Sequence, residues 1–445
     1  MDILISNATI VTMDEAMHIH FGGHLGITGE KITYVGKDAP KETPEKIIDG
    51  TGMVLMPGLI NCHTHLATTL LRGAAEDCSQ GQWFQDYIFP RTDRLDKEAT
   101  RASIDLALAE CLRFGVTSVS DLYGFPEVTA QAICDAGMKA NIALPLSLYA
   151  QEDGDFDFEK DPACKEFCAL VEKWHDFDHG RIRIDAGLQG EYTGDHRLWE
   201  PLSSFAMEKG LGIQVHLSES KPEHEDCLDR TGLTPAQLLS CHHVTDVPMS
   251  AVGCAALEKD DMALLGRKKA SGIVLPVSSM KFAQGIAPVT EMVKSGMNVA
   301  LGTDSAAANN NLDLFEEMKL LSLCTKMKEG NPEALPPQAA LMMATVCGAR
   351  AQGRSGQCGM LKTGLDADLI LVDFTAPHLM PSHDVYSSLV YAARGNDVAL
   401  TMVRGKVLYA GGKFHTIDLS DTVQKVWEYA LPKVLEPAAK EPLAQ

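Results

Sequence analysis

Eight short apolar runs recur through the middle of the chain and constrain its fold more than any other feature. Between them lie stretches long enough for a helix, such as the amphipathic segments 98–115 and 312–330. Eight strands alternating with helices predict an α/β fold, a (β/α)8 barrel. A doubly wound open sheet is the alternative, but no Gly-rich phosphate loop follows the first run. The predicted strands are 59–62, 116–120, 141–148, 182–186, 212–217, 250–254, 272–276 and 298–302.

The two ends of the chain have a different residue pattern, typical of short β-strands. Residues 2–14 alternate apolar and polar side chains like a half-buried strand, and 24–40 read as a hairpin. Short strands with Gly turns return at 366–374 and 398–414. We expect the two ends to pair into one small β-sandwich. The predicted division is 1–57 for its first part, 58–363 for the barrel, and 364–445 for its second part with a C-terminal tail.

Composition restricts the partners and the compartment. The formal net charge of the 445 residues is -21, which argues against nucleic acid or an anionic membrane as a partner. The 12 cysteines form no CxxC pair, so we expect free thiols in a reducing compartment. The first residues lack the basic region of a signal peptide, and no run approaches the ~18 apolar residues of a membrane span. These features predict a cytoplasmic protein.

Polar residues that suit a metal follow several of the predicted strands. His63 and His65 come just after the first, His216 lies near the end of the fifth, and Asp304 follows the eighth. The C-terminal ends of barrel strands meet at one face, and residues i and i+2 of a strand point the same way. Three imidazoles and one carboxylate suit a single divalent ion, zinc or alternatively iron. Such an ion lowers the pKa of a bound water.

Each of these residues also has a structural interpretation. A lone His at a strand end is usually a surface residue or a core residue with a satisfied hydrogen bond. The combination at strand ends of one eight-strand pattern favours the metal site. Glu219, three residues past His216, is either a helix-start carboxylate or a proton shuttle, and its spacing favours the shuttle.

Over nearly its whole length the sequence resembles the amidohydrolase superfamily. The stretches 49–77, 257–265, 276–292, 299–319, 364–373 and 403–414 carry the resemblance. It is strongest to the methylthioadenosine/S-adenosylhomocysteine deaminases and their chlorohydrolase-like relatives. It implies a (β/α)8 barrel beside a β-sandwich and one divalent metal, commonly zinc. It also implies that His63, His65, His216 and Asp304 are the ligands and that Glu219 moves protons.

Four positions depart from that family. Gly253 stands where the sixth strand normally ends in a His that orients the metal hydroxide and the substrate. Gln189 and Val274 replace further His residues after the fourth and seventh strands, and Thr92 replaces a carboxylate that contacts ribose. Because substrates are rejected when their hydrogen-bonding partners are missing, these changes argue against an adenosine-type ligand.

Three hypotheses follow for the function, all with a small-molecule substrate. The first is a metal-dependent hydrolase of a carbon–nitrogen bond in an amino-heterocycle or small amide. The second is a conventional methylthioadenosine/S-adenosylhomocysteine-type deaminase, and the third is a non-catalytic metal-binding relic. A homo-oligomer is compatible with the resemblance. We expect the pocket to be lined by Gln189, Glu191, Trp83, Thr92, Gly253, Cys254 and Ser305, although packing alone explains Trp83 equally well and Cys254 better.

Overall fold

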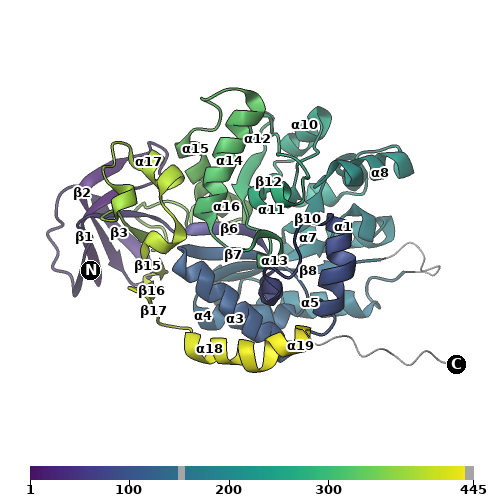
Figure 1. Ribbon diagram of the computed structural model, residues 1–445, viewed down its shortest axis with the longest axis horizontal. Helices are drawn as coiled ribbons and strands as arrows, with labels where there is room; N and C mark the ends of the chain where they lie inside the picture. The colour runs from purple at the N-terminus through teal and green to yellow at the C-terminus, as the bar shows by residue number, and fades with distance from the viewer. Residues whose placement is uncertain (149–155, 436–445) are drawn as a thin grey trace.

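The computed structural model describes residues 1–148 and 156–435. A parallel eight-stranded sheet forms the centre of the larger part, with helices around it (Figure 1). Every predicted run is one of its strands, so the predicted (β/α)8 barrel is confirmed. The strands are β6 (Leu59–Thr64), β7 (Val116–Leu122), β8 (Lys139–Leu146), β9 (Ile182–Leu188), β10 (Ile213–Leu217), β11 (Met249–Gly253), β12 (Ser271–Val274) and β13 (Asn298–Leu301).

The first and last barrel strands are tied together at their C-terminal ends. The amide of Asp304 donates to the carbonyl oxygen of His63 at 3.1 Å. A second pair of contacts joins the same two segments. The side-chain N–H of Asn61 donates to the Thr303 hydroxyl at 2.7 Å, and the side-chain oxygen of Asn61 accepts from the Thr303 N–H at 3.0 Å. These contacts bring His63 and Asp304, 241 positions apart in the chain, to one edge of the barrel.

Helices cover the outside of the barrel and bury the outer face of its strands, while side chains inside the barrel bury the inner face. Their apolar faces come from ordinary amphipathic patterns with Asp, Ser or Thr at many N-caps. The main ones are α3 (Lys97–Arg113), α4 (Pro126–Ala136), α5 (Pro162–Trp174), α7 (His196–Lys209), α8 (Lys221–Thr231), α9 (Pro235–Cys241), α10 (Lys259–Arg267), α11 (Pro276–Lys281), α12 (Val289–Lys294), α14 (Leu314–Glu329), α15 (Pro337–Met343) and α16 (Val346–Ala351).

Shorter helical segments lie mainly in the loops. Those near the C-terminal ends of the strands are η1 (Leu66–Leu71), α1 (Gln80–Gln82), η2 (Trp83–Ile88), α2 (Phe89–Thr92), η3 (Glu191–Thr193) and α13 (Ala306–Asn309). The others are α6 (Phe177–Gly180), η4 (Val244–Asp246), η5 (Pro377–Leu379), α17 (Val385–Ser387), η6 (Ser388–Ala392) and η7 (Gly395–Asp397).

Both ends of the chain build one further sheet beside the barrel, as predicted. It has nine strands in the order β17-β16-β15-β14-β5-β1-β2-β3, with β4 paired to β1. The N-terminal and C-terminal halves meet where β5 pairs antiparallel with β14. Its strands are β1 (Ile3–Val11), β2 (Ile19–Thr28), β3 (Lys31–Gly36), β4 (Lys46–Asp49), β5 (Met53–Pro57), β14 (Leu369–Asp373), β15 (Val398–Val403), β16 (Lys406–Ala410) and β17 (Lys413–Phe414).

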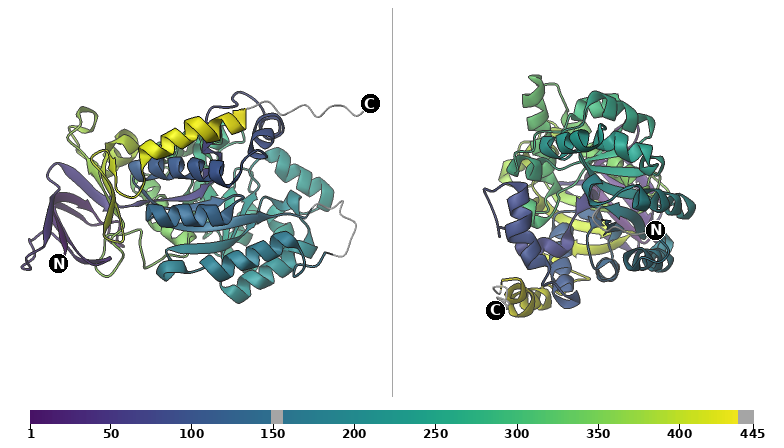
Figure 2. Two further views of the ribbon diagram at one scale, coloured as in Figure 1. Left: turned by 90° about the horizontal axis from the view of Figure 1, so that it is seen from below. Right: turned by 90° about the vertical axis from the view of Figure 1, so that its right-hand side faces the viewer.

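After the last strand the chain returns to the barrel. The segments α18 (Leu419–Lys425), η8 (Val426–Ala430) and α19 (Leu431–Leu435) run along α3 (Figure 2). The Tyr429 hydroxyl donates to Asp96, the N-cap of α3, at 2.6 Å. The second part of the expected sandwich therefore includes a helical arm on the barrel, and the expected tail from 436 lies outside the described residues.

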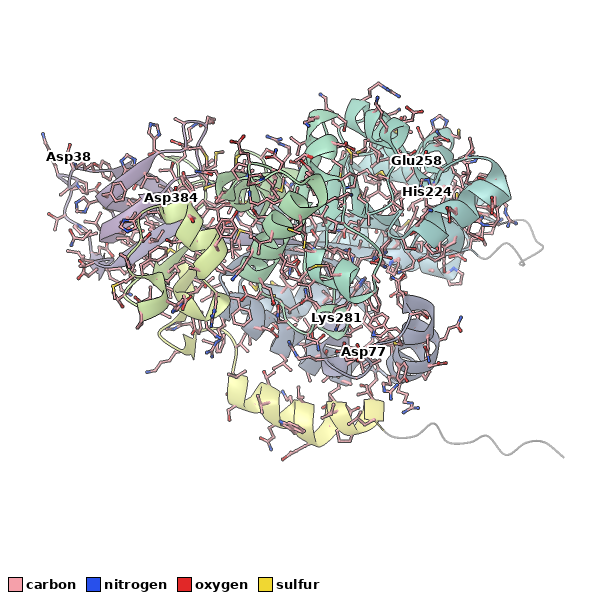
Figure 3. All side chains as sticks on the ribbon, turned by 45° about the horizontal axis from the view of Figure 1, so that its top comes forward. Asp38, Asp77, His224, Glu258, Lys281 and Asp384 are labelled. Carbon is pink, nitrogen blue, oxygen red and sulfur yellow. The ribbon has the colours of Figure 1, made fainter. Side chains whose placement is uncertain are left out.

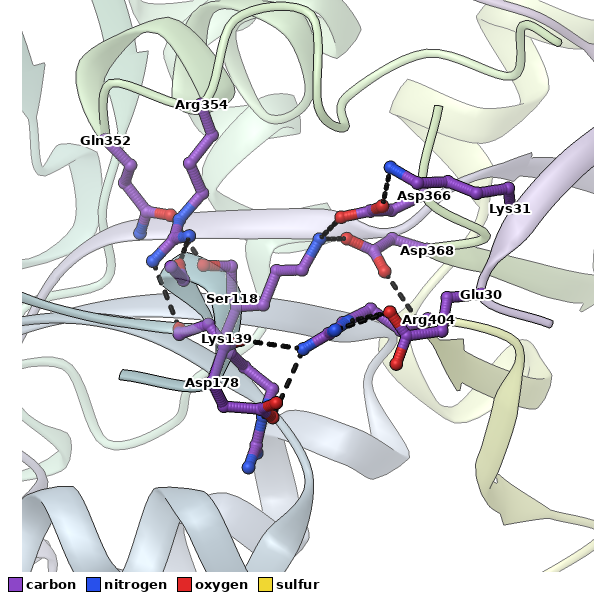
Figure 4. A network of polar contacts seen from close by, with 12 residues as sticks. Glu30, Lys31, Ser118, Lys139, Asp178, Gln352, Arg354, Asp366, Asp368 and Arg404 are labelled. Atoms are coloured by element: carbon purple, nitrogen blue, oxygen red, sulfur yellow. Dashed lines mark hydrogen bonds and ion pairs between the residues drawn. The ribbon is translucent and has the colours of Figure 1, made fainter. Parts of the chain in front are cut away.

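Buried charges join the β domain to the barrel. Lys139, at the start of β8, has only 1% of its side chain exposed and pairs with Asp366 at 2.6 Å and with Asp368. The Asp366 carboxylate also accepts from Lys31, at 2.6 Å. Figure 4 shows this chain of contacts continuing through Asp368 to Arg404. The contact lies at the N-terminal ends of the barrel strands, opposite the histidines.

All 12 cysteines are free thiols, as predicted. Within residues 1–148 and 156–435, no helix is long and apolar enough to cross a bilayer.

Candidate metal centre and active site

Three imidazoles converge inside the C-terminal mouth of the barrel. His63 and His65 come from the end of β6 and His216 from β10. The Nε2 atoms of His63 and His65 lie 3.1 Å apart, and those of His63 and His216 lie 3.2 Å apart. The alternation of side chains along β6 aims the two histidines at one point, as the sequence predicts.

Hydrogen bonds on the far side of two rings fix their tautomers. The Nδ1 atom of His65 lies 2.6 Å from the carbonyl oxygen of Leu122, and that of His216 lies 2.7 Å from the carbonyl oxygen of Gln189. A carbonyl oxygen only accepts, so each Nδ1 carries the proton and each Nε2 keeps a lone pair. The ligand atoms of all three rings lie within 4.8 Å of one another, and those of His65 and His216 present lone pairs. The three rings therefore fit a metal ion.

Burial keeps His63 and His65 in the neutral form that binds metal. It lowers the pKa of His63 well below its usual value, and the neighbouring His65 and His216 lower it further. Burial, followed by the charge of His216, lowers the pKa of His65 to about 3. Neutral imidazole is the ligand form, so proton competition for these two rings is weak.

Asp304 lies beside the imidazoles just after β13. Its Oδ1 is 3.6 Å from Nε2 of His65 and accepts from the N–H of Ser305 at 2.5 Å. Its φ of +63° is uncommon outside glycine, and such strain concentrates at functional sites. Burial, followed by the charge of Glu219, raises the pKa of Asp304 to about 6. Two carboxylates close to three imidazoles favour a divalent cation electrostatically.

Glu219 is carried on a turn between β10 and α8 that is itself tightly held. The Glu223 carboxylate accepts from the amides of Ser218 at 3.1 Å, Glu219 at 2.7 Å and Ser220 at 3.3 Å. Ser218 has a φ of +47°, and its hydroxyl lies 3.0 Å from Nδ1 of His224. His224 and Glu258, labelled in Figure 3, extend this polar cluster at 3.7 Å. The turn fixes where the Glu219 side chain starts.

A cleft of about 330 Å³ opens beside Glu219. Its charged lining consists of carboxylates, and its aromatic lining is Phe84 and Tyr192. Glu191 is 1% exposed and pairs with Arg230 at 2.8 Å. The full set of lining residues is Gln80, Gly81, Phe84, Glu191, Tyr192, Glu219, Glu223 and Asp226.

The sixth strand has no room for the side chain that the resemblance would place there. A Cβ at Gly253 would lie 2.9 Å from both Cβ and Cγ of Glu219. Gly253 and Val274 instead line a separate cavity of about 20 Å³, enough for about one water. Glu219 therefore fills the space next to the end of β11.

The remaining predicted pocket residues lie at different depths. Trp83 is 6% exposed and packs on Phe84 and Phe282 with ring centroids 4.9 and 5.2 Å away. Cys254 is fully buried, and its thiol lies 3.2 Å from the carbonyl oxygen of Ala251. Gln189 contributes its backbone carbonyl to His216, as described above.

Thr92 lies one contact away from the metal-facing rings. It interacts with Tyr123, whose ring centroid is 6.0 Å from that of His65. Three supporting groups were not predicted from the sequence: the carbonyl of Leu122, the carboxylate of Glu223, and the side-chain amide of Gln80, which donates to Oε2 of Glu219 at 3.0 Å. Only Glu223 had a signal, because Ser220 and Glu223 form the S-x-x-E pattern of a capping box.

Comparison with known proteins agrees with this geometry. The model of the amidohydrolase family matches residues 54–408. The chain belongs to the amidohydrolase family. A 5-methylthioadenosine/S-adenosylhomocysteine deaminase of Moorella thermoacetica is 37% identical over 427 residues, 95% of this chain and 98% of that protein. A 5'-deoxyadenosine deaminase of Methanosarcina mazei is 37% identical over 430 residues, 96% of this chain and 98% of that protein.

A solved structure has the same architecture. The zinc-bound adenosine deaminase from Xanthomonas campestris superimposes with a TM-score of 0.89 at 26% identity, covering 96% of this chain and 97% of that one. Membership of the amidohydrolase family and the imidazole cluster confirm a metal-dependent hydrolase of the deaminase type, which acts on carbon–nitrogen bonds other than peptide bonds.

Proposed function

We propose that this enzyme deaminates a 5'-modified adenosine, such as 5'-methylthioadenosine or 5'-deoxyadenosine, with one zinc ion. Water replaces the amino group on the purine and ammonia leaves. The observation that carries the proposal is the convergence of the Nε2 atoms of His63, His65 and His216 beside the carboxylates of Asp304 and Glu219. The relatives at 37% identity supply the substrate class.

Each residue has a role in this proposal. His63, His65, His216 and Asp304 hold the ion, which when bound makes a hydroxide available near neutral pH. Glu219 accepts the proton of the attacking water and delivers it to the departing nitrogen. The cleft beside Glu219 holds the nucleoside, with Phe84 and Tyr192 available to pack on a flat ring.

The test combines metal analysis with ammonia release. We expect bound zinc, and turnover of 5'-methylthioadenosine, 5'-deoxyadenosine or S-adenosylhomocysteine. The change Glu219→Gln should lower kcat by about 100-fold or more while the metal stays bound. Glu225→Gln, the same change on the exposed side of α8, is the control and should retain full activity. Full activity in the Glu219→Gln variant would refute the assigned role.

A shifted substrate is the second candidate. It is favoured by Gly253 and Val274, which leave an apolar cavity instead of two imidazoles. Release of ammonia from an amino-triazine or aminopyrimidine, with none from the adenosines, would select it. Bound metal without turnover on either set would instead support a non-catalytic protein.

A further inference from the structure

Glu219 receives a hydrogen bond from a segment far away in the sequence. The side-chain amide of Gln80, in α1, donates to Oε2 of Glu219 at 3.0 Å. The two residues are 139 positions apart. In the part of the chain that the structure describes, Oε1 of Glu219 has no hydrogen bond to a protein group. The contact therefore occupies one carboxylate oxygen and leaves the other for water or substrate.

The segment that carries Gln80 is anchored independently of Glu219. Ser79 caps α1 by accepting from the N–H of Gln82 at 3.3 Å, and its carbonyl accepts from Trp83 at 2.8 Å. Trp83 is buried against Phe282. Gln80 is thus presented to Glu219 by a packed element that forms one wall of the cleft.

The other sides of Glu219 are also fixed. Its backbone amide is bound by Glu223, and its Cβ and Cγ lie against Gly253. The remaining freedom is rotation about the last bonds of the side chain, and this is what a donor on Oε2 removes. A neutral amide can fix the orientation of the Glu219 carboxylate and still allow it to take up a proton, whereas a lysine would hold that carboxylate as a permanent anion.

We propose that Gln80 is a positioning residue, which orients the Glu219 carboxylate for proton transfer and couples it to the segment from Gln80 to Thr92. The expected effect on turnover rests on the proposed function, whereas the contact between Gln80 and Glu219 is independent of it.

The kinetic test is a series at one position. We expect Gln80→Met, which keeps the shape but cannot donate, to lower kcat by about 10- to 100-fold with KM changed less than about twofold. Gln80→His, which can donate, should recover part of the loss, and Gln80→Glu should be worse than Gln80→Met because two carboxylates would meet. Gln85→Met, on the exposed side of the same segment, is the matched control.

Hydrogen exchange gives a readout that needs no turnover. Both Gln80→Met and Glu219→Ala should speed the exchange of amides between residues 83 and 92, and Gln85→Met should not. If the wild type releases no ammonia from the adenosines, the proposed substrate class fails while exchange still decides the coupling. Wild-type kcat in Gln80→Met, or unchanged exchange in both variants, would overturn the inference.

Discussion

Replacing Gly253 by histidine tests how the end of the sixth strand serves the site. The resemblance to other amidohydrolases places an imidazole here, so a simple reading predicts that Gly253→His restores a missing group. The structure predicts the opposite. A Cβ would lie 2.9 Å from two side-chain atoms of Glu219 and 3.0 Å from its Cα. Because the Cα is backbone, the whole turn that carries Glu219 would have to shift.

Two costs set the magnitude. Gly253 has a φ of +94°, and a non-glycine residue there costs about 1–3 kcal/mol. Overpacking against Glu219 costs about 1–3 kcal/mol more. We therefore expect the free energy of unfolding to fall by about 2–6 kcal/mol. Displacing Glu219, the proposed proton shuttle, by about 1 Å should lower kcat by about 100-fold.

The assay is ammonia release from 5'-deoxyadenosine together with thermal unfolding. Gly253→Ala should already show most of both losses, because the Cβ causes the clash. Gly330→Ala is the control for backbone strain alone, since Gly330 has a φ of +60° with open space around its missing Cβ. A Gly253→His enzyme that is more active than the wild type, with an unchanged unfolding temperature, would refute this reasoning.

Two further predictions concern the metal and the domain contact. His216→Ala should lose both its metal, measured by elemental analysis, and its activity, measured by ammonia release. His242→Ala, at the end of α9, should keep both. Equal metal content in the two variants would contradict the site. Lys139→Met should lower the free energy of unfolding by about 3–5 kcal/mol, because it leaves the buried carboxylate of Asp368 without its ion-pair partner. Lys173→Met, in an exposed pair, should change it little. Burial raises the pKa of Asp366, but Lys139 and Lys31 lower it more, so that the pKa lies below its usual value. The ionised Asp366 therefore stabilises the wild type at neutral pH, and this stabilisation should be lost only as the pH falls below about 4. Thermal unfolding across that range checks the sign, and a Lys139→Met protein with the wild-type acid dependence would contradict it.

The barrel was predictable because its strands are covered on both faces. Such strands read as continuous apolar runs, and all eight runs were recognisable for that reason. The grouping of the three histidines and Asp304 at one end of the barrel was predictable by the same logic, since strand ends in a barrel share one face. His63, His65, His216 and Asp304 needed no knowledge of how the loops fold.

The support around these residues was not predictable. Gln80 lies in a loop without periodicity, and nothing in its neighbourhood indicates a partner at Glu219. The carbonyls of Leu122 and Gln189 act through the backbone, which carries no residue-type signal. At Gly253 the sequence did hold a clue. A glycine inside a strand often marks close approach of another group, and here that group is Glu219.

The pairing of β5 with β14 has a consequence for synthesis on the ribosome. When β5 (residues 53–57) leaves the ribosome, β1 has already been made and can pair with one of its edges. The strand that pairs with the other edge, β14, begins only at Leu369. At about 5–20 residues per second, that edge waits roughly 15–60 s for its partner. During this time the nascent chain exposes an apolar strand that could pair with another copy. Slow translation or a truncation before Leu369 should therefore favour aggregation through the N-terminal strands, although the active-site residues would already have been made.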